Sequence, residues 1–164
     1  MINQIIKWVC CIIKRPKLGY LMVATLGIFL GISLITYLGL RYEVALLFPS
    51  LASSAVVLFA SRVSMTKVKS IVGGQLISAL AGVTVSQLLG STWWSISLGV
   101  TLAMVLMELT HTLHPPGGAT AFVAVLSNQT YVFVFKPVFL GLGILILAAL
   151  VVQFLARLKN YCVT

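Results

Sequence analysis

Six long apolar runs occupy almost the whole chain, and they constrain its fold more than any other feature. Of the 164 residues, 60% are hydrophobic and 8% are charged, which leaves too little polar surface for a water-soluble globule. A bilayer core about 30 Å thick needs about 20 helical residues to cross it. We therefore predict an all-α, polytopic membrane protein with six short membrane segments. These segments cover residues 18–40, 44–60, 71–90, 96–110, 115–134 and 138–156.

The placement of positive charge indicates how many of these segments cross the membrane. The chain carries eleven Lys or Arg residues against two acidic ones. If all six segments cross from a cytoplasmic N-terminus, every cation except Arg41 and Lys136 lies on the cytoplasmic side. If residues 44–60 and 115–134 instead dip in and return, the cations divide almost evenly. Because cytoplasmic loops are enriched in Lys and Arg, we predict six crossings, cytoplasmic termini and insertion in the plasma (inner) membrane.

The residues before the first long run have a different pattern. Apolar residues recur there at helical spacing, while Lys7 and Lys14 fall on the opposite side. This pattern predicts an amphipathic helix in the membrane interface at residues 1–17, and a frayed tail is the alternative. The run at residues 18–40 is too long for a cleavable signal. We expect that run to be the first anchor of a transmembrane domain at residues 18–160.

An internal repeat relates the two segments that proline and glycine interrupt. Shifting the sequence by 66 positions places residues 48–55 (FPSLASSA) on residues 114–121 (HPPGGATA). Both read proline, small residues, a hydroxyl side chain and alanine, and an apolar run follows. Each lies in the middle of a three-segment unit, at residues 18–90 and 91–160. Because three crossings reverse the direction of the chain, the second unit enters from the opposite side, which predicts an inverted repeat.

The two interrupted helix starts form the candidate binding site, because such helices often meet near the middle of the bilayer in transporter folds. Proline in a first turn lacks only an N–H that would be unbonded anyway. The remaining N–H groups and the positive end of the helix dipole favour a small anion. The alternative is that these residues serve helix packing. The candidate substrate-binding residues, all at the two starts, are Pro49, Ser50, Ser53, Ser54, His114, Pro115, Pro116, Gly117, Gly118 and Thr120.

A second set of polar residues adjoins the later helix start. Glu108, His111 and His114 are spaced i, i+3 and i+6, so we expect them to share one helix face. Ionisable groups at membrane depth point to function, and we expect this set to take up a proton that accompanies the anion. The alternative is an interfacial Glu–His pair that anchors the helix. Lys67 and Lys69 are secondary anion-attracting candidates.

Metal binding and catalysis have little support in the sequence. Glu43 is the only acidic residue besides Glu108, so a di-metal centre lacks ligands, and haem would need a histidine on another segment. A Ser–His–Asp set is excluded because the chain contains no Asp. The cations lie between apolar runs rather than in a stripe, so nucleic acid is not an expected partner. We expect no metal, no cofactor and no enzymatic activity.

The segment at residues 107–126, MELTHTLHPPGGATAFVAVL, resembles the characteristic motif of the HPP family of membrane proteins. Residues 50–59 and 68–79 resemble two further runs of that family. Nitrite transport has been associated with members from chloroplasts and cyanobacteria, so the resemblance implies transport of nitrite or a similar anion. It also implies four membrane helices, which would fit two segments that do not cross. Four positions depart from the family pattern: Ala52 stands where Gly is usual, Val68 where Pro is, Lys69 where Arg is, and Gln75 where His is.

The sequence as a whole predicts transport of a small inorganic anion, nitrite-like, through a site between the two broken helix starts. The alternative is a structural or regulatory membrane subunit in which the broken helices only pack. Six short segments have little interior of their own. The small-residue surfaces at residues 73–74 and 141–143 therefore predict a homo-oligomer.

The number of crossings can be tested by cysteine labelling. In a variant without the native cysteines, single cysteines replace Lys67 or Lys136. Six crossings place these positions on opposite sides, so an impermeant maleimide added to intact cells should label position 136 and reach position 67 only after permeabilisation. Labelling of both positions from outside would instead support two segments that dip in and return.

Overall fold

The computed structural model describes residues 18–41, 48–59 and 64–158. Within these residues the chain is helical, with turns and no strand, which confirms the predicted all-α class. The interfacial helix expected at residues 1–17 lies outside the described part of the chain. The described elements are α2 (Leu18–Arg41), α3 (Phe48–Phe59), α4 (Met65–Leu89), α5 (Trp93–Leu109), α6 (Pro116–Leu126), the π-helix η2 (Val134–Phe139) and α7 (Leu140–Leu158).

The α-helices among the described residues correspond one to one to the predicted segments. Two stretches, Thr66–Leu89 and Val134–Phe154, are long and apolar enough to cross a membrane. The two interrupted segments give the shortest α-helices, with 12 residues in α3 and 11 in α6. Proline lies in the first turn of each, where its missing N–H removes no helical hydrogen bond.

The predicted extent of the fifth segment, residues 115–134, is wrong. Helix α6 ends at Leu126, and Asn128 has a left-handed backbone with φ 49°. The Asn128 and Gln129 amides donate to the carbonyls of Val125 and Ala124, a bonding pattern that closes a helix end. The last apolar helix consequently begins earlier than expected, at Val134, and passes Pro137 within the π-helical turn η2.

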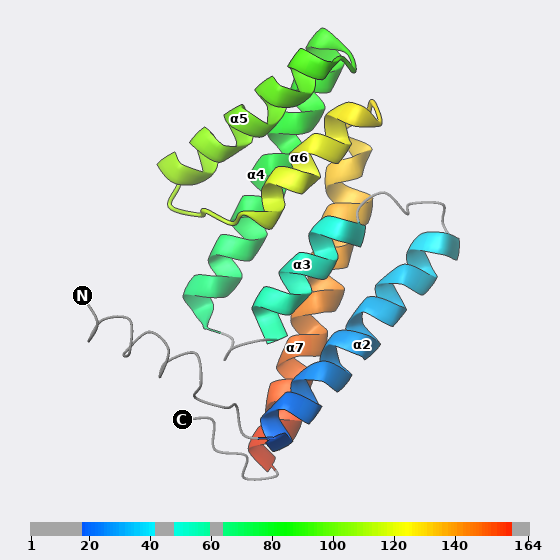
Figure 1. Ribbon diagram of the computed structural model, residues 1–164, viewed down its shortest axis with the longest axis vertical. Coiled ribbons are helices and arrows are strands. Elements are labelled where there is room, and N and C mark those ends of the chain that lie inside the picture. The colour runs from blue at the N-terminus through cyan, green and yellow to red at the C-terminus, as the bar shows by residue number, and fades with distance from the viewer. Residues whose placement is uncertain (1–17, 42–47, 60–63, 159–164) are drawn as a thin grey trace, which may run out of the picture.

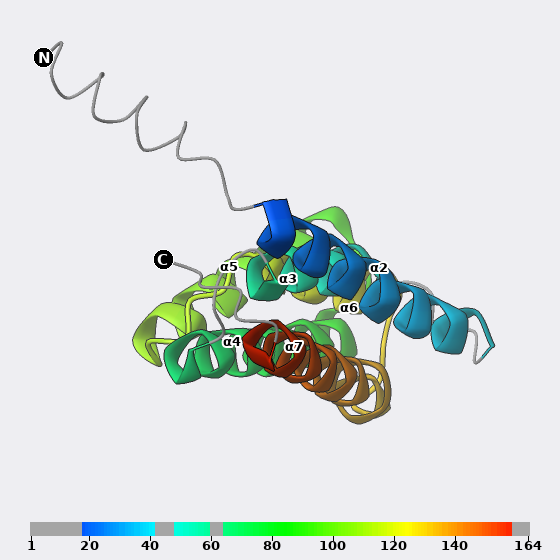
Figure 2. The same cartoon turned by 90° about the horizontal axis from the view of Figure 1, so that it is seen from below.

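The helices pack as two groups, and each group combines two helices of one predicted three-segment unit with the third helix of the other unit. Helix α2 packs on α3 and α7, whereas α5 packs on α6 and α4. Figure 1 shows α2 in the lower part of the view and α5 in the upper part, with α3 and α6 between them running in opposite directions. Seen from below, α2 and α3 lie on the opposite side of the molecule from α4 and α7 (Figure 2). The two broken helices are therefore central.

Close packing in both groups depends on glycine. The ring of Phe59 in α3 lies over α2, where a Cβ added at Gly27 would sit 2.8 Å from its Cε1 atom. In the other group, a Cβ added at Gly82 of α4 would lie 2.7 Å from the carbonyl oxygen of Ala121 in α6. Small residues allow such close approach between membrane helices, where van der Waals packing replaces hydrophobic burial.

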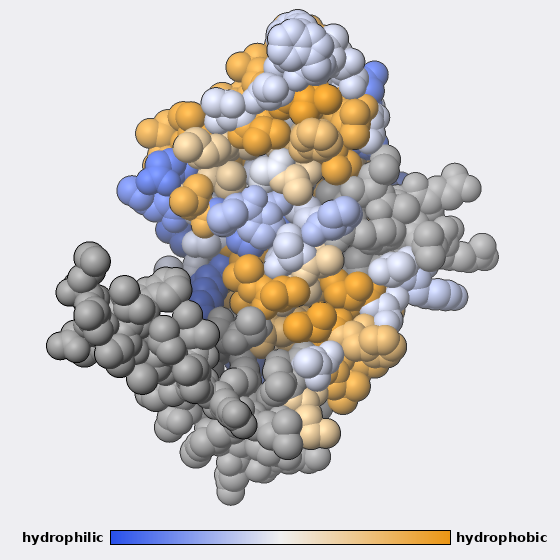
Figure 3. Space-filling view, in the orientation of Figure 1, coloured by the Kyte–Doolittle hydropathy of each residue, from blue (hydrophilic) through white to orange (hydrophobic). Residues whose placement is uncertain are grey.

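The glycine surfaces predicted to hold a second copy are largely covered by the chain itself. An added Cβ would lie 2.6 Å from Thr112 at Gly73, and 2.6 Å from Leu51 at Gly141. The surface expected at residues 73–74 is therefore an intramolecular contact, and of the glycines in the two predicted surfaces only Gly143 has no atom within 4 Å of its Cβ position. A homo-oligomer stays a prediction, but the glycines at residues 73–74 no longer support it. Figure 3 shows apolar residues over much of the surface, with a more hydrophilic band between the upper and lower parts.

Substituting Gly82 by Ala should test the α4–α6 contact. The added methyl group meets backbone atoms, and we expect a destabilisation of about 1–3 kcal/mol. Gly143→Ala is the matched control, because nothing lies within 4 Å of its Cβ position and Ala favours a helix over Gly by about 0.5–1 kcal/mol. Thermal unfolding of the purified proteins in detergent measures both. Equal midpoints for the two variants would contradict the close contact.

Candidate functional site

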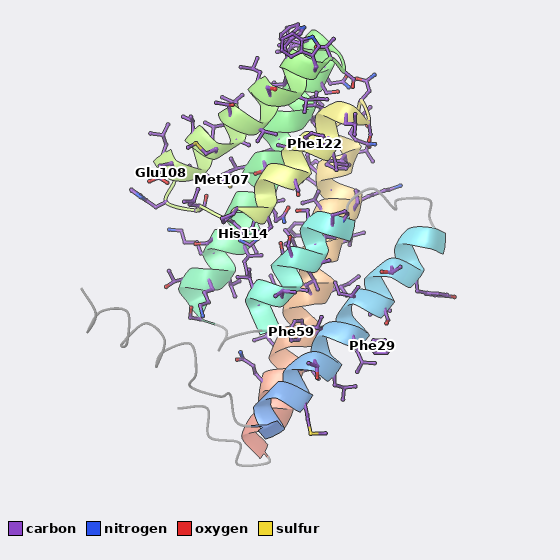
Figure 4. The ribbon with its side chains drawn as sticks, viewed as in Figure 1. Phe29, Phe59, Met107, Glu108, His114 and Phe122 are labelled. Atoms are coloured by element: carbon purple, nitrogen blue, oxygen red, sulfur yellow. The ribbon has the colours of Figure 1, made fainter. Side chains whose placement is uncertain are left out.

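Five buried polar side chains from four parts of the chain meet where α3, α4 and α6 come together. Each is at most 3% exposed. Helix α3 supplies Ser50 and Ser54, α4 supplies Gln75, α6 supplies Thr120, and the turn before α6 supplies His114. We call these five residues the polar cluster. Figure 4 shows His114 between the ribbons of α4 and α3, close to the start of α6.

The two broken helix starts are in direct contact within the polar cluster. The Ser50 hydroxyl donates to the carbonyl oxygen of Pro116 at 2.7 Å, and these positions are the 66-residue equivalents of the internal repeat. The hydroxyls of Ser50 and Thr120 lie 2.6 Å apart. The structure therefore brings the starts of residues 49–60 and 115–127 together, while the binding of an anion between them stays a prediction.

Gln75 connects both helix starts to the middle of α4. Its Nε2 atom donates to the hydroxyl oxygens of Ser50 and Ser54, each at 2.8 Å. Its Oε1 atom accepts from the Thr120 hydroxyl. One amide group therefore holds hydroxyls from two other helices, which no other side chain of the polar cluster does.

His114 reaches the polar cluster because the turn that carries it approaches α4 closely. Its Nε2 atom lies 2.9 Å from the Ser54 hydroxyl oxygen. On the α4 side, a Cβ added at Gly74 would be 2.5 Å from the Cβ of His114 and 2.8 Å from the carbonyl oxygen of Thr112. Glycine at position 74 thus permits the position of the imidazole.

Four of the predicted binding residues lie away from the polar cluster. Pro49, Ser53 and Pro115 are exposed, and the Ser53 hydroxyl donates to the carbonyl oxygens of Pro49 and Ser50 in its own helix. Gly118 is partly exposed, with only Val100 within 4 Å of its Cβ position. Helical periodicity explains this division, because neighbouring positions of α3 and α6 point to different sides.

The expectation of unbonded amides at the start of α6 is wrong. The Gly117 amide donates to the carbonyl oxygen of His114 at 2.8 Å, and the Gly118 amide donates to that of Pro115 at 3.0 Å. The chain turns tightly enough before α6 for these carbonyls to take the place of a ligand. The remaining donors at this helix start are side chains, namely hydroxyls, an amide and an imidazole.

The expected helix face of Glu108, His111 and His114 is also wrong. Helix α5 ends at Leu109, and His111 has a left-handed backbone with φ 53° that a continuing helix does not allow. Glu108 and His111 are exposed, whereas His114 is buried. Figure 4 places Glu108 at the end of α5, away from His114. Of this set, the structure brings only His114 into the polar cluster.

The two lysines predicted to attract anions lie at the start of α4. Lys69 is exposed and Lys67 is partly exposed. Gln75 follows Lys69 by about 9 Å along the helix axis. These cations are thus outside the polar cluster. Among the described residues, no group of three His, Cys, Asp or Glu side chains is arranged to hold a metal ion.

Gln75 is the site residue that the sequence-based prediction omitted. Two signals in the sequence indicated it. It is an uncharged polar side chain within an apolar segment, and it stands where the HPP pattern usually has His. Neither signal fixes which side of α4 faces α3 and α6, so the sequence alone shows Gln75 only as a departure from the family pattern.

The fold and the polar cluster define a helical membrane protein with a buried polar centre between two broken helices. The family model described as "HPP, transmembrane region" matches residues 13–162. The chain therefore belongs to the HPP family of transmembrane proteins, as the sequence motif predicted.

Two curated relatives are transmembrane proteins of Dictyostelium discoideum. One is 32% identical over 90% of this chain and 58% of its own length. Another is 34% identical over 83% of this chain and 48% of its own length. The chain thus spans about half the length of the curated relatives it matches. No solved structure matches the chain.

Substituting Gln75 by Leu should show how much the amide stabilises the fold. The change keeps a similar volume but leaves the Thr120 hydroxyl and two serine oxygens without their partner, so we expect a loss of about 1–3 kcal/mol. Gln87→Leu is the matched control, because Gln87 lies in the same helix, is exposed and makes a single hydrogen bond to the Gln129 carbonyl. Thermal unfolding in detergent compares the two, and similar losses would contradict a special role of Gln75.

Proposed function

We propose that this protein carries a small inorganic anion, nitrite-like, across the plasma (inner) membrane. The anion would bind at the polar cluster, between the starts of α3 and α6. The observation that carries the proposal is the contact of two proline-led helix starts, whose hydroxyls meet Gln75 and His114 inside a largely apolar helical protein. Polar groups at membrane depth are costly, so a cluster of five is a strong indication of function.

An inverted repeat would account for this arrangement. Helices α2, α3 and α4 correspond to α5, α6 and α7 along the chain, and each first helix packs on the third helix of the other unit. The broken middle helices run in opposite directions from their contact (Figure 1). Transporters built from such repeats alternate access by moving one unit against the other around a central site. Six crossings with cytoplasmic termini complete the proposal.

In the described conformation the hydroxyls bind one another, which fits a closed state without anion. Among the described residues, no buried side-chain nitrogen or oxygen lacks a hydrogen-bond partner. A hydroxyl can both donate and accept. An entering anion would therefore separate Ser50 from Thr120 and receive the hydrogens that these hydroxyls now direct at protein atoms. The α6 amides would take no part, because they are bonded within the turn.

A structural or regulatory membrane subunit is the second candidate. The paired hydroxyls of the polar cluster favour it, because they hold α3, α4 and α6 together without any ligand. This candidate predicts that the polar cluster contributes to stability and to no flux. Among the described residues no metal-ligand set supports an enzymatic role, and we propose none.

Transport is tested with purified protein in lipid vesicles, by measuring initial rates of nitrite uptake against protein-free vesicles. Ser54→Ala and Thr120→Val each remove one hydroxyl of the polar cluster. We expect each to lower the rate at least about tenfold, because a hydrogen bond to a charged ligand contributes about 1.5–3 kcal/mol.

The matched controls are Ser97→Ala and Thr101→Val, which remove exposed hydroxyls that bond within α5. Both should keep the parent rate. Absence of nitrite, nitrate and formate flux in the parent, at every pH gradient, removes the transport proposal. If the parent protein transports nitrite and none of the four substitutions changes its rate, the binding site lies elsewhere and the polar cluster has a structural role.

A further inference from the structure

The hydrogen-bond directions in the polar cluster follow from counting hydrogens. The two hydrogens of Gln75 Nε2 go to Ser50 and Ser54, and the hydrogen of Thr120 goes to Gln75 Oε1. The Ser50 hydrogen is then shared between the Pro116 carbonyl oxygen and the Thr120 hydroxyl oxygen, as a three-centre bond. Only the pair formed by Ser54 and His114 has a direction that is still open.

The surroundings of the imidazole decide that direction. The Ser54 hydrogen has two possible acceptors at 2.9 Å, the Ser50 carbonyl oxygen and His114 Nε2. Among the described residues His114 makes no hydrogen bond through Nδ1. A hydrogen on Nδ1 would leave Nε2 to accept the Ser54 hydrogen, and the Ser50 carbonyl oxygen would then lose that hydrogen bond. A hydrogen on Nε2 is paired with Ser54 instead, and the Ser54 hydrogen then goes to Ser50.

The Nδ1 atom has a further property. Every fully buried polar side-chain atom of the described residues has a partner, and Nδ1 has none. It therefore belongs to the 3% of the His114 surface that is exposed. The polar cluster thus presents one open acceptor, a nitrogen lone pair, at the edge of a group of saturated hydroxyls.

We infer that His114 is the Nε2–H tautomer, that its Nδ1 atom is where the polar cluster takes up a proton, and that Gln75 is the residue that positions this arrangement. The inference deepens the proposed function, on which its transport part rests. The proton adds to the Nδ1 lone pair and no bond breaks. The resulting imidazolium carries one positive charge beside the anion site, where it offsets the charge of a monovalent anion at membrane depth.

The other charged and titratable groups lie outside the polar cluster. Of the elements packed against α4, α5 carries Glu108 and η2 carries Lys136, both exposed, while α3 and α6 carry none. His111 is exposed in the turn that holds His114, and Tyr131 is exposed before η2. The lysines of α4 itself, Lys67 and Lys69, precede Gln75 by about 9–12 Å along the axis. Within the described residues, the imidazole of His114 is the group through which a proton can change the charge of the polar cluster.

Nitrogen-15 NMR of the protein in lipid bilayers tests the tautomer without any transport measurement. The chain has two histidines, so His111→Gln leaves His114 as the sole source of imidazole signals in protein labelled with ¹⁵N-histidine. At neutral pH we expect a protonated Nε2 and an unprotonated Nδ1. On acidification Nδ1 should gain a proton while Nε2 keeps its own. A neutral imidazole with its hydrogen on Nδ1 would overturn the inference.

The role of Gln75 is tested in the same background. Without its donor to Ser54, Gln75→Leu should give a mixture of both tautomers, whereas Gln87→Leu should keep the parent spectrum. If Gln75→Leu does not fold, Ser54→Ala removes the partner of Nε2 directly and should give the same mixture. A single Nε2–H tautomer in the folded Gln75→Leu protein, or in Ser54→Ala, would contradict the positioning role.

Flux measurements separate this inference from the proposed function. In vesicles with an imposed pH gradient, parent uptake of nitrite should rise at least about tenfold when protons are supplied on the nitrite side. His114→Gln should lose this dependence on pH. If the NMR result is as expected and no flux exists at any pH, only the proposed function fails. If flux exists and is equally pH-dependent in His114→Gln, the proton-uptake inference fails while transport stands.

Discussion

The hydrogen bond from Ser50 to the Pro116 carbonyl organises the rest of the structure. A helix that begins inside an apolar protein exposes polar groups that neither water nor lipid can satisfy there, and each unsatisfied group costs several kcal/mol. At the start of α6 the amides bond to carbonyls of their own turn, and the hydroxyls that line the two helix starts bond across to the other helix. Their contact also fixes the positions of the outer helices, since α2 packs on α3 and α5 packs on α6.

Glycines next to the polar cluster allow the helices to approach closely enough for the contact between α3 and α6. The turn that carries His114 lies against α4 only because Gly74 has no side chain, and Gly117 of α6 lies against Ser78 for the same reason. Gln75 is the next residue after Gly74. The glycine that permits the close approach is therefore adjacent to the side chain that bonds to the serine hydroxyls. The backbone and the polar side chains of this region are therefore a single unit, in which moving the turn by the width of a methyl group would separate Ser54 from His114.

The sequence predicted the features that depend on local pattern. Apolar runs gave the all-α class and the helices, and a shift of the sequence onto itself gave the pair of broken starts that meet. Features that depend on how the chain turns in space escaped it. The end of α6 at Leu126 and the separation of Glu108 from His114 are both set by left-handed residues, Asn128 and His111, that interrupt a periodicity the sequence seemed to continue. Gln75 was missed because the polar residues of α4 are distributed around the helix, so no polar face indicates its rotation.

A site of side-chain hydroxyls differs physically from the site of backbone amides that the sequence suggested. An amide N–H has a fixed direction, so an amide site without its anion leaves donors unpaired or must rearrange the backbone. A hydroxyl rotates, and it can donate to a neighbour in one state and to an anion in another. The hydroxyls of the polar cluster could therefore have hydrogen-bond partners both without an anion and with one bound. Under the proposed function, the bonded Gly117 and Gly118 amides would leave that exchange to Ser50, Ser54 and Thr120. The hydroxyls are thus suited to alternation between the two states, whereas the glycines and prolines around them supply the fixed frame.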